Sequence, residues 1–217
     1  MDPSDHLHLL LTFHESCLPP HAHVCIAETF DAGKSWQLHD GDSRWTSDGE
    51  GVKAYFLEDK NTWLWMSQAD GMWRSTDAGK TWTQLTSENA NHLQSTQVHR
   101  TKNGTFLVGG MGSFWRSPTG TSAGTWTKIA TPGTLPGGVV SDGNTIYMST
   151  CYYPGFCDPA FDMIYLTASE NDVDTWTPMA SPPISVMKSG GILGYDPGHH
   201  ILFSSNTGGG FWRLVTK

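Results

Sequence analysis

The chain has 217 residues and a formal net charge of −8, and it is rich in glycine (24) and tryptophan (10). This length is enough to bury one sizeable core, and the abundance of turn residues and aromatics is typical of β-rich proteins. The sequence has no run of Lys or Arg and no apolar stretch long enough to span a bilayer. We therefore expect neither nucleic acid nor membrane as a partner.

A short motif recurs along the chain and divides it into repeats. It reads TFDAGKSW at residues 29–36 and STDAGKTW at residues 75–82, with degenerate copies at 117–126 and 168–176. The last tryptophans of the four copies are 46, 44 and 50 residues apart. Recurrence at such a period indicates a repeat architecture, in which each repeat is one supersecondary unit. We predict one domain, 1–217, with repeats at 1–40, 41–88, 89–131, 132–181 and 182–217.

Within each repeat, apolar segments alternate with Gly, Asn or Asp turns, which is the pattern of antiparallel strands joined by hairpins. In the first repeat, residues 7–13 match the second strands of the other repeats, so its innermost strand is missing. The fifth repeat stops one strand short. The strands predicted for the later repeats are 52–57, 62–67, 72–75 and 81–85; 97–101, 105–109, 114–117 and 125–129; 138–141, 145–150, 163–167 and 175–179; and 191–195, 201–205 and 210–214.

Four antiparallel strands per repeat, repeated radially, predict an all-β fold, a β-propeller of about five four-stranded blades. The incomplete end blades leave three interpretations. The chain is a five-bladed ring with truncated ends, which we favour, or it closes through a partner chain, or it is part of a larger propeller. Because open sheet edges promote association, a homo-oligomer through the end blades is also expected.

The motif resembles the Asp-box (BNR) repeat, Ser-x-Asp-x-Gly-x-Thr-Trp. The resemblance covers nearly the whole chain and implies the fold shared by sialidases, xyloglucan-cleaving glycosidases, sortilin-type receptors and photosystem assembly factors. Locally, Asp31 and Asp77 are expected to accept hydrogen bonds from the turn backbone. Gly33 and Gly79 allow positive φ, and the tryptophan packs between neighbouring sheets. We assign these motifs a structural role and no catalysis.

Sialidase activity is not expected. By family resemblance, that chemistry needs three arginines that hold a carboxylate. The chain has five arginines, and Arg74, Arg116 and Arg213 occupy the same strand position in three repeats, after a tryptophan. Only Arg44 and Arg100 remain. Three arginines could therefore be brought together only by using one that occupies the repeated strand position.

Four cysteines form two close pairs, Cys17/Cys25 and Cys151/Cys157. Neither pair has zinc-site spacing, and two local pairs in a loop-rich chain predict two disulfides and a secreted or extracytoplasmic protein. The first residues lack the basic region of a signal peptide, so we expect that such a segment was removed or that the chain is part of a longer one. Both pairs fall in long loops between second and third strands. Such loops lie opposite the motif hairpins, which makes that face the expected functional face.

Aligned second strands and inter-repeat loops bring a set of polar and aromatic residues to this face, as expected for a sugar site. A glycosidase needs two carboxylates that flank the scissile bond. The candidate acids and bases are Glu15, Glu50, Asp70 and Asp158. The candidate sugar-contacting residues are Trp45, Gln68, His92, Tyr152, Tyr153, Lys188 and Asn206.

Three histidines, His14, His21 and His23, flank one cysteine-bracketed loop. Three imidazoles on one hairpin could bind a divalent transition metal, with Gln68 or Glu15 completing the shell. By analogy, some propeller-fold uronate lyases use a histidine-rich metal centre. The alternative is that these imidazoles are simply exposed loop side chains. We expect no other cofactor.

The sequence therefore favours a secreted carbohydrate-active propeller, similar to glycoside hydrolases, that acts on or binds a polysaccharide on the face opposite the motif hairpins. It leaves open whether the chain is an enzyme. The alternatives are a non-catalytic lectin-like or scaffold propeller and a metal-assisted polysaccharide lyase. Fold alone does not decide among them.

Overall fold

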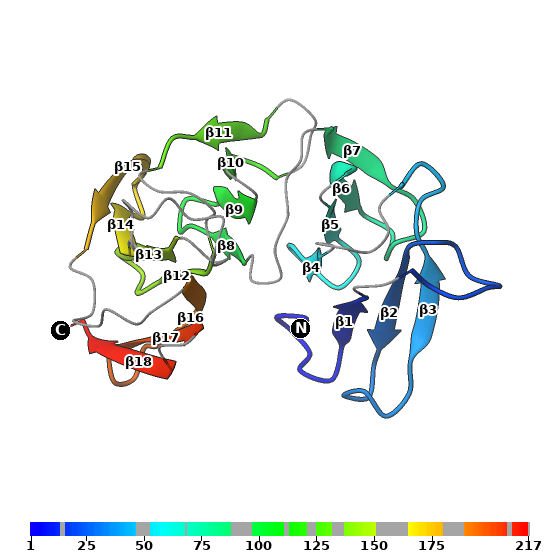
Figure 1. Ribbon diagram of the computed structural model, residues 1–217, viewed down its shortest axis with the longest axis horizontal. Helices are drawn as coiled ribbons and strands as arrows, with labels where there is room; N and C mark the ends of the chain where they lie inside the picture. The colour runs from blue at the N-terminus through cyan, green and yellow to red at the C-terminus, as the bar shows by residue number, and fades with distance from the viewer. Residues whose placement is uncertain are drawn as a thin grey trace. The chain divides into compact units, whose positions relative to one another are not determined.

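The computed structural model describes residues 1–13, 16–46, 53–67, 69–87, 97–110, 113–120, 125–131, 137–150, 165–179, 189–207 and 210–216. These residues form an all-β fold of five small antiparallel sheets, the blades of a β-propeller (Figure 1). They divide into two compact units, the first within residues 1–94 and the second within residues 95–120 and 125–217. The described residues contain no helix that is long and apolar enough to cross a membrane.

The first unit contains two sheets. One has the order β1-β2-β3, with β1 at Leu9–Thr12, β2 at Cys25–Thr29 and β3 at Gln37–Asp40. The other has the order β4-β5-β6-β7, with β4 at Lys53–Phe56, β5 at Trp63–Ser67, β6 at Gly71–Ser75 and β7 at Thr83–Thr86.

The second unit contains three sheets. The first comprises β8 (Val98–Arg100), β9 (Phe106–Gly110), β10 (Ser113–Ser117) and β11 (Thr127–Ile129). The next comprises β12 (Val139–Ser141), β13 (Thr145–Ser149), β14 (Tyr165–Ser169) and β15 (Asp172–Pro178). The last comprises β16 (Ser189–Asp196), β17 (Ile201–Thr207) and β18 (Gly210–Val215).

The predicted strands are confirmed within a few residues at each end, and so is the incompleteness of the terminal blades. In its described residues the β1-β2-β3 sheet lacks an inner strand next to β1, and the β16-β17-β18 sheet lacks an outer strand next to β18. The other three sheets have four strands each.

Packed aromatic and aliphatic side chains hold neighbouring sheets together within each unit. In the first unit, indoles from β5, β6 and the inter-sheet loops pack with Val24 and Ile26 of the first sheet. In the second unit, Phe114 of β10 meets Trp176 of β15 edge to face, with ring centroids 5.3 Å apart. Burying large apolar side chains supplies most of the free energy that stabilises such a fold.

A single side chain joins the three inner strands of the second unit. The Gln97 amide group donates to the Leu193 carbonyl at 3.1 Å, and its oxygen accepts from the Val139 and Leu193 amides, each at 3.1 Å. Gln97 precedes β8, whereas Val139 lies on β12 and Leu193 on β16. Inner-strand amides that face no partner strand are satisfied in this way.

Two hairpins, which we call the Asp31 turn (29–36) and the Asp77 turn (75–82), have matching geometry. Asp31 accepts from the Ser35 amide at 2.9 Å and from the Ser35 hydroxyl at 2.7 Å. Asp77 accepts from Thr81 in the same two ways, at 2.9 and 2.6 Å. The glycine two residues after each aspartate has positive φ, as predicted.

Candidate functional site

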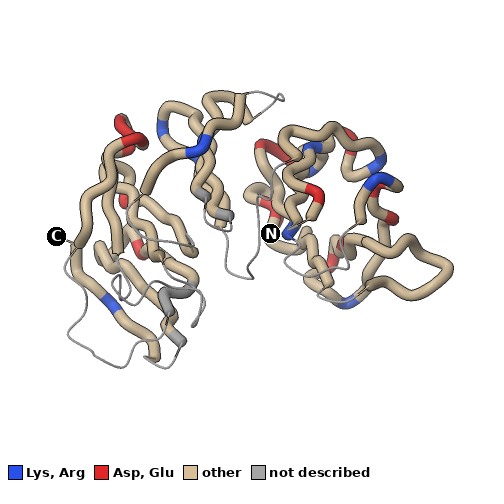
Figure 2. The backbone as a smooth tube through the Cα atoms, turned by 45° about the horizontal axis from the view of Figure 1, so that its top comes forward, with Lys and Arg blue, Asp and Glu red and all other residues tan. Residues whose placement is uncertain are grey.

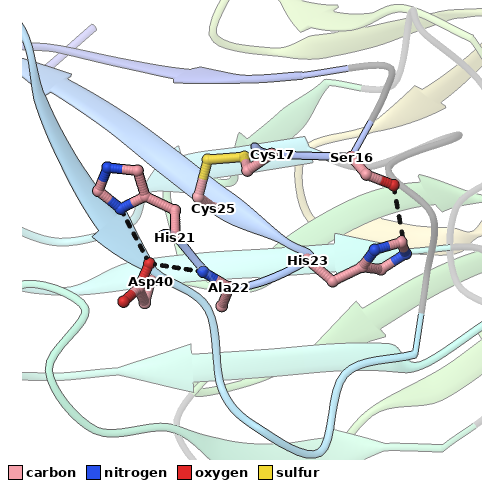
Figure 3. The surroundings of a disulfide bond; sticks show 7 residues. All are labelled: Ser16, Cys17, His21, Ala22, His23, Cys25 and Asp40. Carbon is pink, nitrogen blue, oxygen red and sulfur yellow. Dashed lines mark hydrogen bonds and ion pairs between the residues drawn. A yellow bond between two sulfur atoms is a disulfide. The ribbon is translucent and has the colours of Figure 1, made fainter. Parts of the chain in front are cut away.

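The loop bracketed by Cys17 and Cys25 is the part of the predicted functional face that the structure describes most fully (Figure 3). The two cysteines form the predicted disulfide, with their Cα atoms 6.0 Å apart. The Cys17 amide donates to the His23 carbonyl at 2.9 Å, and the Gly41 amide donates to the Val24 carbonyl at 2.8 Å. The loop is therefore fixed to β2 and to the end of β3.

Asp40, the last residue of β3, organises this loop. One of its carboxylate oxygens accepts from the Ala22 amide at 2.9 Å and lies 3.1 Å from His21 Nδ1 (Figure 3). The Ala22 hydrogen bond is the main reason that the pKa of Asp40 lies below its usual range. Both side chains reach solvent, since Asp40 is 57 % and His21 34 % exposed. An exposed carboxylate and imidazole held at fixed positions suit hydrogen bonding to hydroxyl groups of a ligand.

His23 points away from His21 and Asp40, and its Nε2 lies 3.3 Å from the Ser16 hydroxyl (Figure 3). No group of three or more His, Cys, Asp or Glu side chains suited to a metal ion occurs among the described residues. His14, the third predicted ligand, lies outside them, so the predicted set of three histidines stays a prediction.

Asp70, one of the predicted catalytic carboxylates, has a structural role. It is 8 % exposed, and one of its oxygens accepts from the amide and the hydroxyl of Thr46, at 2.9 and 2.7 Å. Its other oxygen lies 3.1 Å from the Ser67 hydroxyl. These bonds tie the inter-sheet loop to the turn before β6. A buried carboxylate with several donors is poorly placed to exchange protons with a substrate.

Trp45, predicted to stack on sugar, lies in the core. It is 6 % exposed, and its ring stacks on Trp65 with centroids 3.6 Å apart and planes within 4°. Trp82 meets its edge at 4.9 Å. Because its ring is buried against Trp65 and Trp82, we omit Trp45 from the candidate site. Arg44 beside it is exposed, and its guanidinium lies 4.4 Å from the centre of the Trp73 ring.

Asn206, predicted to contact sugar, belongs to a buried polar cluster. Its carboxamide oxygen accepts from the Tyr165 hydroxyl at 2.7 Å, and Ser204 lies 2.7 Å from the same hydroxyl. Burial raises the pKa of Tyr165. The cluster joins β14 to β17 and leaves Asn206 8 % exposed. The hydrogen bonds of Asn206 therefore stabilise the contact between these two strands.

The remaining predicted residues lie outside the described part of the chain. They are Glu15, Glu50 and Asp158 among the acids, Gln68, His92, Tyr152, Tyr153 and Lys188 among the sugar-contacting residues, His14 among the metal ligands, and the pair Cys151 and Cys157.

Sequence reasoning missed a buried chain of ionisable groups in the first sheet. His8 Nδ1 lies 2.9 Å from Asp2, and His8 Nε2 lies 2.7 Å from Glu28, whose other oxygen lies 2.7 Å from His39 Nε2. Asp2, His8 and Glu28 are at most 3 % exposed. Both ring nitrogens of His8 therefore lie within hydrogen-bond distance of a carboxylate.

The Asp2–His8–Glu28–His39 chain fastens the residues before β1 to the sheet, and its His39 end is 27 % exposed. Burial alone would raise the pKa of Asp2, but hydrogen bonds from Ser4 and His8 lower it to about 2. The available signal was Glu28, a carboxylate that directly follows the apolar residues Cys25, Ile26 and Ala27 and that requires a partner when it is buried.

The second unit has an open groove of about 420 Å³ on the blade formed by β12 to β15. Hydroxyl groups dominate its walls, beside one carboxylate, Asp172. That carboxylate already accepts from the Asp174 amide at 3.1 Å. The lining side chains with hydroxyls are Thr145, Thr167, Ser169, Thr175 and Thr177. The groove borders the 168–176 hairpin and is thus not on the face that the sequence predicted to be functional.

Figure 2 shows that lysines and arginines lie singly along the described trace, interspersed with acidic residues. The described surface therefore offers no extended basic stripe of the kind that neutralises a polyanion.

Comparison with known proteins identifies the fold. No protein-family profile and no curated protein sequence matches the chain. Among solved structures, a GH74 enzyme from Niastella koreensis superposes with a TM-score of 0.65 at 19 % identity, over 98 % of this chain and 35 % of that one. The GH74 xyloglucanase from Xanthomonas campestris gives 0.65 at 14 %, over 99 % and 36 %.

YCF48 bound to D1 peptide gives a TM-score of 0.58 at 16 % identity, over 88 % of this chain and 58 % of that one. The chain thus spans less than two thirds of the length of each of these structures. Likeness at such low identity shows the propeller fold alone.

Proposed function

We propose that the protein is an extracytoplasmic Asp-box propeller that binds a polysaccharide through the Cys17–Cys25 loop and neighbouring loops on the face opposite its motif hairpins. The observation that carries the proposal is the His21–Asp40 pair. A disulfide and three backbone hydrogen bonds hold it in place, yet both side chains reach solvent. A preorganised polar pair loses little freedom on binding, which favours affinity for hydroxyl-rich ligands.

Several further observations support this assignment. Disulfides persist in oxidising compartments, so the Cys17–Cys25 bond favours an extracytoplasmic location. The structural neighbours include GH74 enzymes, one named as a xyloglucanase. Xyloglucan is therefore the first polysaccharide to test.

The finer proposal is hydrolysis. With Asp70 committed to Thr46 and Ser67, the acid and base would come from Glu15, Glu50 and Asp158. Gln68, His92, Tyr152, Tyr153 and Lys188 would contact the sugar. A Glu→Gln or Asp→Asn change at either member of a catalytic pair removes turnover while binding persists.

A direct experiment separates the candidate functions. The purified chain is incubated with xyloglucan and other plant and microbial polysaccharides, and binding, new reducing ends and unsaturated products are measured in parallel. Binding with reducing ends supports a hydrolase, and binding alone supports a lectin. Unsaturated products together with bound metal support the lyase that would use His14, His21 and His23.

The contribution of the loop is tested with His21→Ala and Asp40→Ala, which should weaken polysaccharide binding about tenfold, since each hydrogen bond to a charged group contributes about 1.5 kcal/mol. His199→Ala is the matched control, because its imidazole makes a similar exposed contact to Asp196 in the second unit. Equal binding by all three variants would remove the loop from the proposal.

A second candidate is a peptide-binding scaffold. The specific observation in its favour is the YCF48 structure, which contains a bound peptide. Failure to bind any polysaccharide would favour this candidate.

A further inference from the structure

The turn between β8 and β9 carries a sequence pattern that the proposed function does not use. It reads Asn103-Gly104-Thr105, an asparagine followed two positions later by a threonine, with a residue other than proline between them. Of the seven asparagines in the chain, only Asn103 has Ser or Thr at that distance. This pattern is the acceptor signal for N-linked glycosylation, and it acts on surface loops of exported proteins.

The structure places this pattern at the tip of a tight hairpin. The Gly104 amide donates to the Thr101 carbonyl at 2.9 Å, and the Thr101 amide donates to the Thr105 carbonyl at 2.8 Å. Gly104 has φ 84°, which glycine adopts without steric cost. The turn places Lys102 and Asn103 at its tip, and both residues are exposed. A fixed backbone therefore presents the Asn103 carboxamide to solvent.

The side-chain contact of Asn103 is compatible with an attached sugar. Its Nδ2 donates to Asn171 Oδ1 at 3.2 Å. A carboxamide nitrogen carries two hydrogens. Attachment of a sugar replaces one of them, so Nδ2 keeps a donor for Asn171. The folded hairpin can therefore carry the modification without a change in its backbone.

The surroundings of Asn103 are polar. The neighbouring Lys102 side chain reaches Asn144, with Nζ 3.2 Å from the carboxamide oxygen. Asn144 and Asp172 belong to the groove on the blade of β12 to β15, whose other walls are mainly hydroxyl groups. Sugars attached at Asn103 would meet carboxamides and hydroxyls, which donate and accept hydrogen bonds.

The contact with Asn171 also shows on which side of the second unit Asn103 lies. Asn171 belongs to the 168–176 hairpin, so Asn103 lies on the same side as that hairpin. The loops proposed to bind polysaccharide lie on the face opposite the motif hairpins. A glycan at Asn103 therefore leaves that face accessible.

We propose that Asn103 is the acceptor of an N-linked oligosaccharide that begins with N-acetylglucosamine. In the transfer, Asn103 Nδ2 loses a proton and bonds to the anomeric carbon of the sugar. The bond from that carbon to a lipid-linked pyrophosphate breaks, and the pyrophosphate leaves with the electron pair. The donor is thus a lipid-linked oligosaccharide of the secretory pathway. The proposal rests on the extracytoplasmic location proposed above.

The test expresses the full chain behind a cleavable signal peptide in eukaryotic cells, and mass spectrometry is applied to the secreted protein and its peptides. We expect a glycan that peptide N-glycosidase removes, leaving aspartate at position 103. Asn103→Gln should abolish this glycan. Asn144→Gln is the matched control, because Asn144 is exposed in the corresponding β12–β13 turn but has Ile146 two positions later.

Two variants at position 105 separate recognition of the pattern from the fold. Thr105→Val keeps the β-branched shape and removes the hydroxyl that the pattern requires, so it should abolish the glycan. Thr105→Ser keeps the hydroxyl and should retain the glycan. Each variant is also translated with endoplasmic reticulum microsomes, where a glycosidase-sensitive gel shift reports transfer. A variant that fails to fold and is not secreted therefore still gives a result.

The proposal is overturned if the parent chain carries no glycan, if Asn103→Gln still carries it, or if Thr105→Val and Thr105→Ser are glycosylated equally. It is also overturned if the parent chain is glycosylated in microsomes but secreted only without the glycan, because the folded hairpin would then exclude the sugar. Since the experiment supplies the signal peptide, a missing glycan leaves the proposed polysaccharide binding untouched. Failure of polysaccharide binding likewise leaves the acceptor site untouched.

Discussion

The Asp31 turn and the Asp77 turn share their hydrogen bonds but differ in where they place the tryptophan. Trp36 is 42 % exposed, and its indole bends back so that Nε1 donates to the Gly33 carbonyl at 3.1 Å. Trp82 is 7 % exposed and packs against Trp45 and Trp63. The same local chemistry therefore produces the turn in both places, while the neighbouring sheet decides whether the tryptophan contributes to a core.

The residue that covers the glycine explains the difference. A Cβ atom on Gly79 would lie 2.5 Å from the Trp63 ring, so this ring covers the turn. Leu9 occupies the place of Trp63 in the first sheet, as the strand registers show. There the Trp36 ring itself covers Gly33, at 3.3 Å from the same hypothetical atom. The comparison thus separates turn formation from core packing, and three pairs of variants test it.

Variants of the two tryptophans should differ most from each other in the free energy of unfolding. Trp82→Ala removes an indole from a packed cluster and should lower the free energy of unfolding by about 3–5 kcal/mol. Trp36→Ala loses one indole hydrogen bond and partly exposed area, and should cost about 1 kcal/mol. Urea denaturation of both variants with the disulfide intact measures the two values. Equal losses would show that the exposed indole also contributes to a core.

The glycines should give a smaller difference. Gly33 has φ 87° and Gly79 has φ 77°, and an L-residue in the left-handed region costs about 1–2 kcal/mol. Gly79→Ala must also displace the fully buried Trp63 ring, which adds about 1–3 kcal/mol of overpacking.

For Gly33→Ala the nearest atoms to the new Cβ belong to the exposed Trp36 ring, which can swing away. Its cost should therefore stay near the backbone cost alone. Thermal unfolding of the two variants measures the difference. A larger loss for Gly33→Ala than for Gly79→Ala would contradict the assignment of Trp63 as the covering residue.

Much of this fold could be predicted from the sequence, because repetition compensates for weak local signals. Asp31, Gly33 and their counterparts recur at fixed offsets, so the turns and the strands around them were predicted correctly. The prediction that the motif tryptophan packs between sheets holds for Trp176 but is wrong for Trp36. Burial at that position depends on a neighbouring sheet, which the local motif does not encode.

The candidate site was harder to predict for the same reason. The Cys17–Cys25 bond was predicted because two nearby cysteines carry their own chemistry. Asp70 and Trp45 were chosen as residues that could meet a sugar, and the fold instead uses them in its interior. Residue type shows what a side chain can do, whereas its partners, here Thr46 and Trp65, come from distant segments.

Variants of the two aspartates should differ least from each other in stability. They test the hydrogen bonds that the two turns share. Hydrogen bonds from the Ser35 side chain and amide lower the pKa of Asp31 to about 2, and the Thr81 side chain likewise lowers that of Asp77. A carboxylate whose pKa is lower in the folded state stabilises the fold above its unfolded pKa. This stabilisation is lost as the pH falls through the folded value. The Asp31 turn should therefore weaken from about pH 4 down to about pH 2, and the Asp77 turn should weaken as the pH falls below about 4.

Asp31→Asn and Asp77→Asn should each remove part of this acid sensitivity, by similar amounts, because the two carboxylates have the same donors. The measurement is the slope of unfolding free energy against pH over that range for both variants and the parent chain. If only Asp77→Asn changes the slope, the buried Trp82 would contribute to the acid response, and the two turns would not be equivalent in their local chemistry.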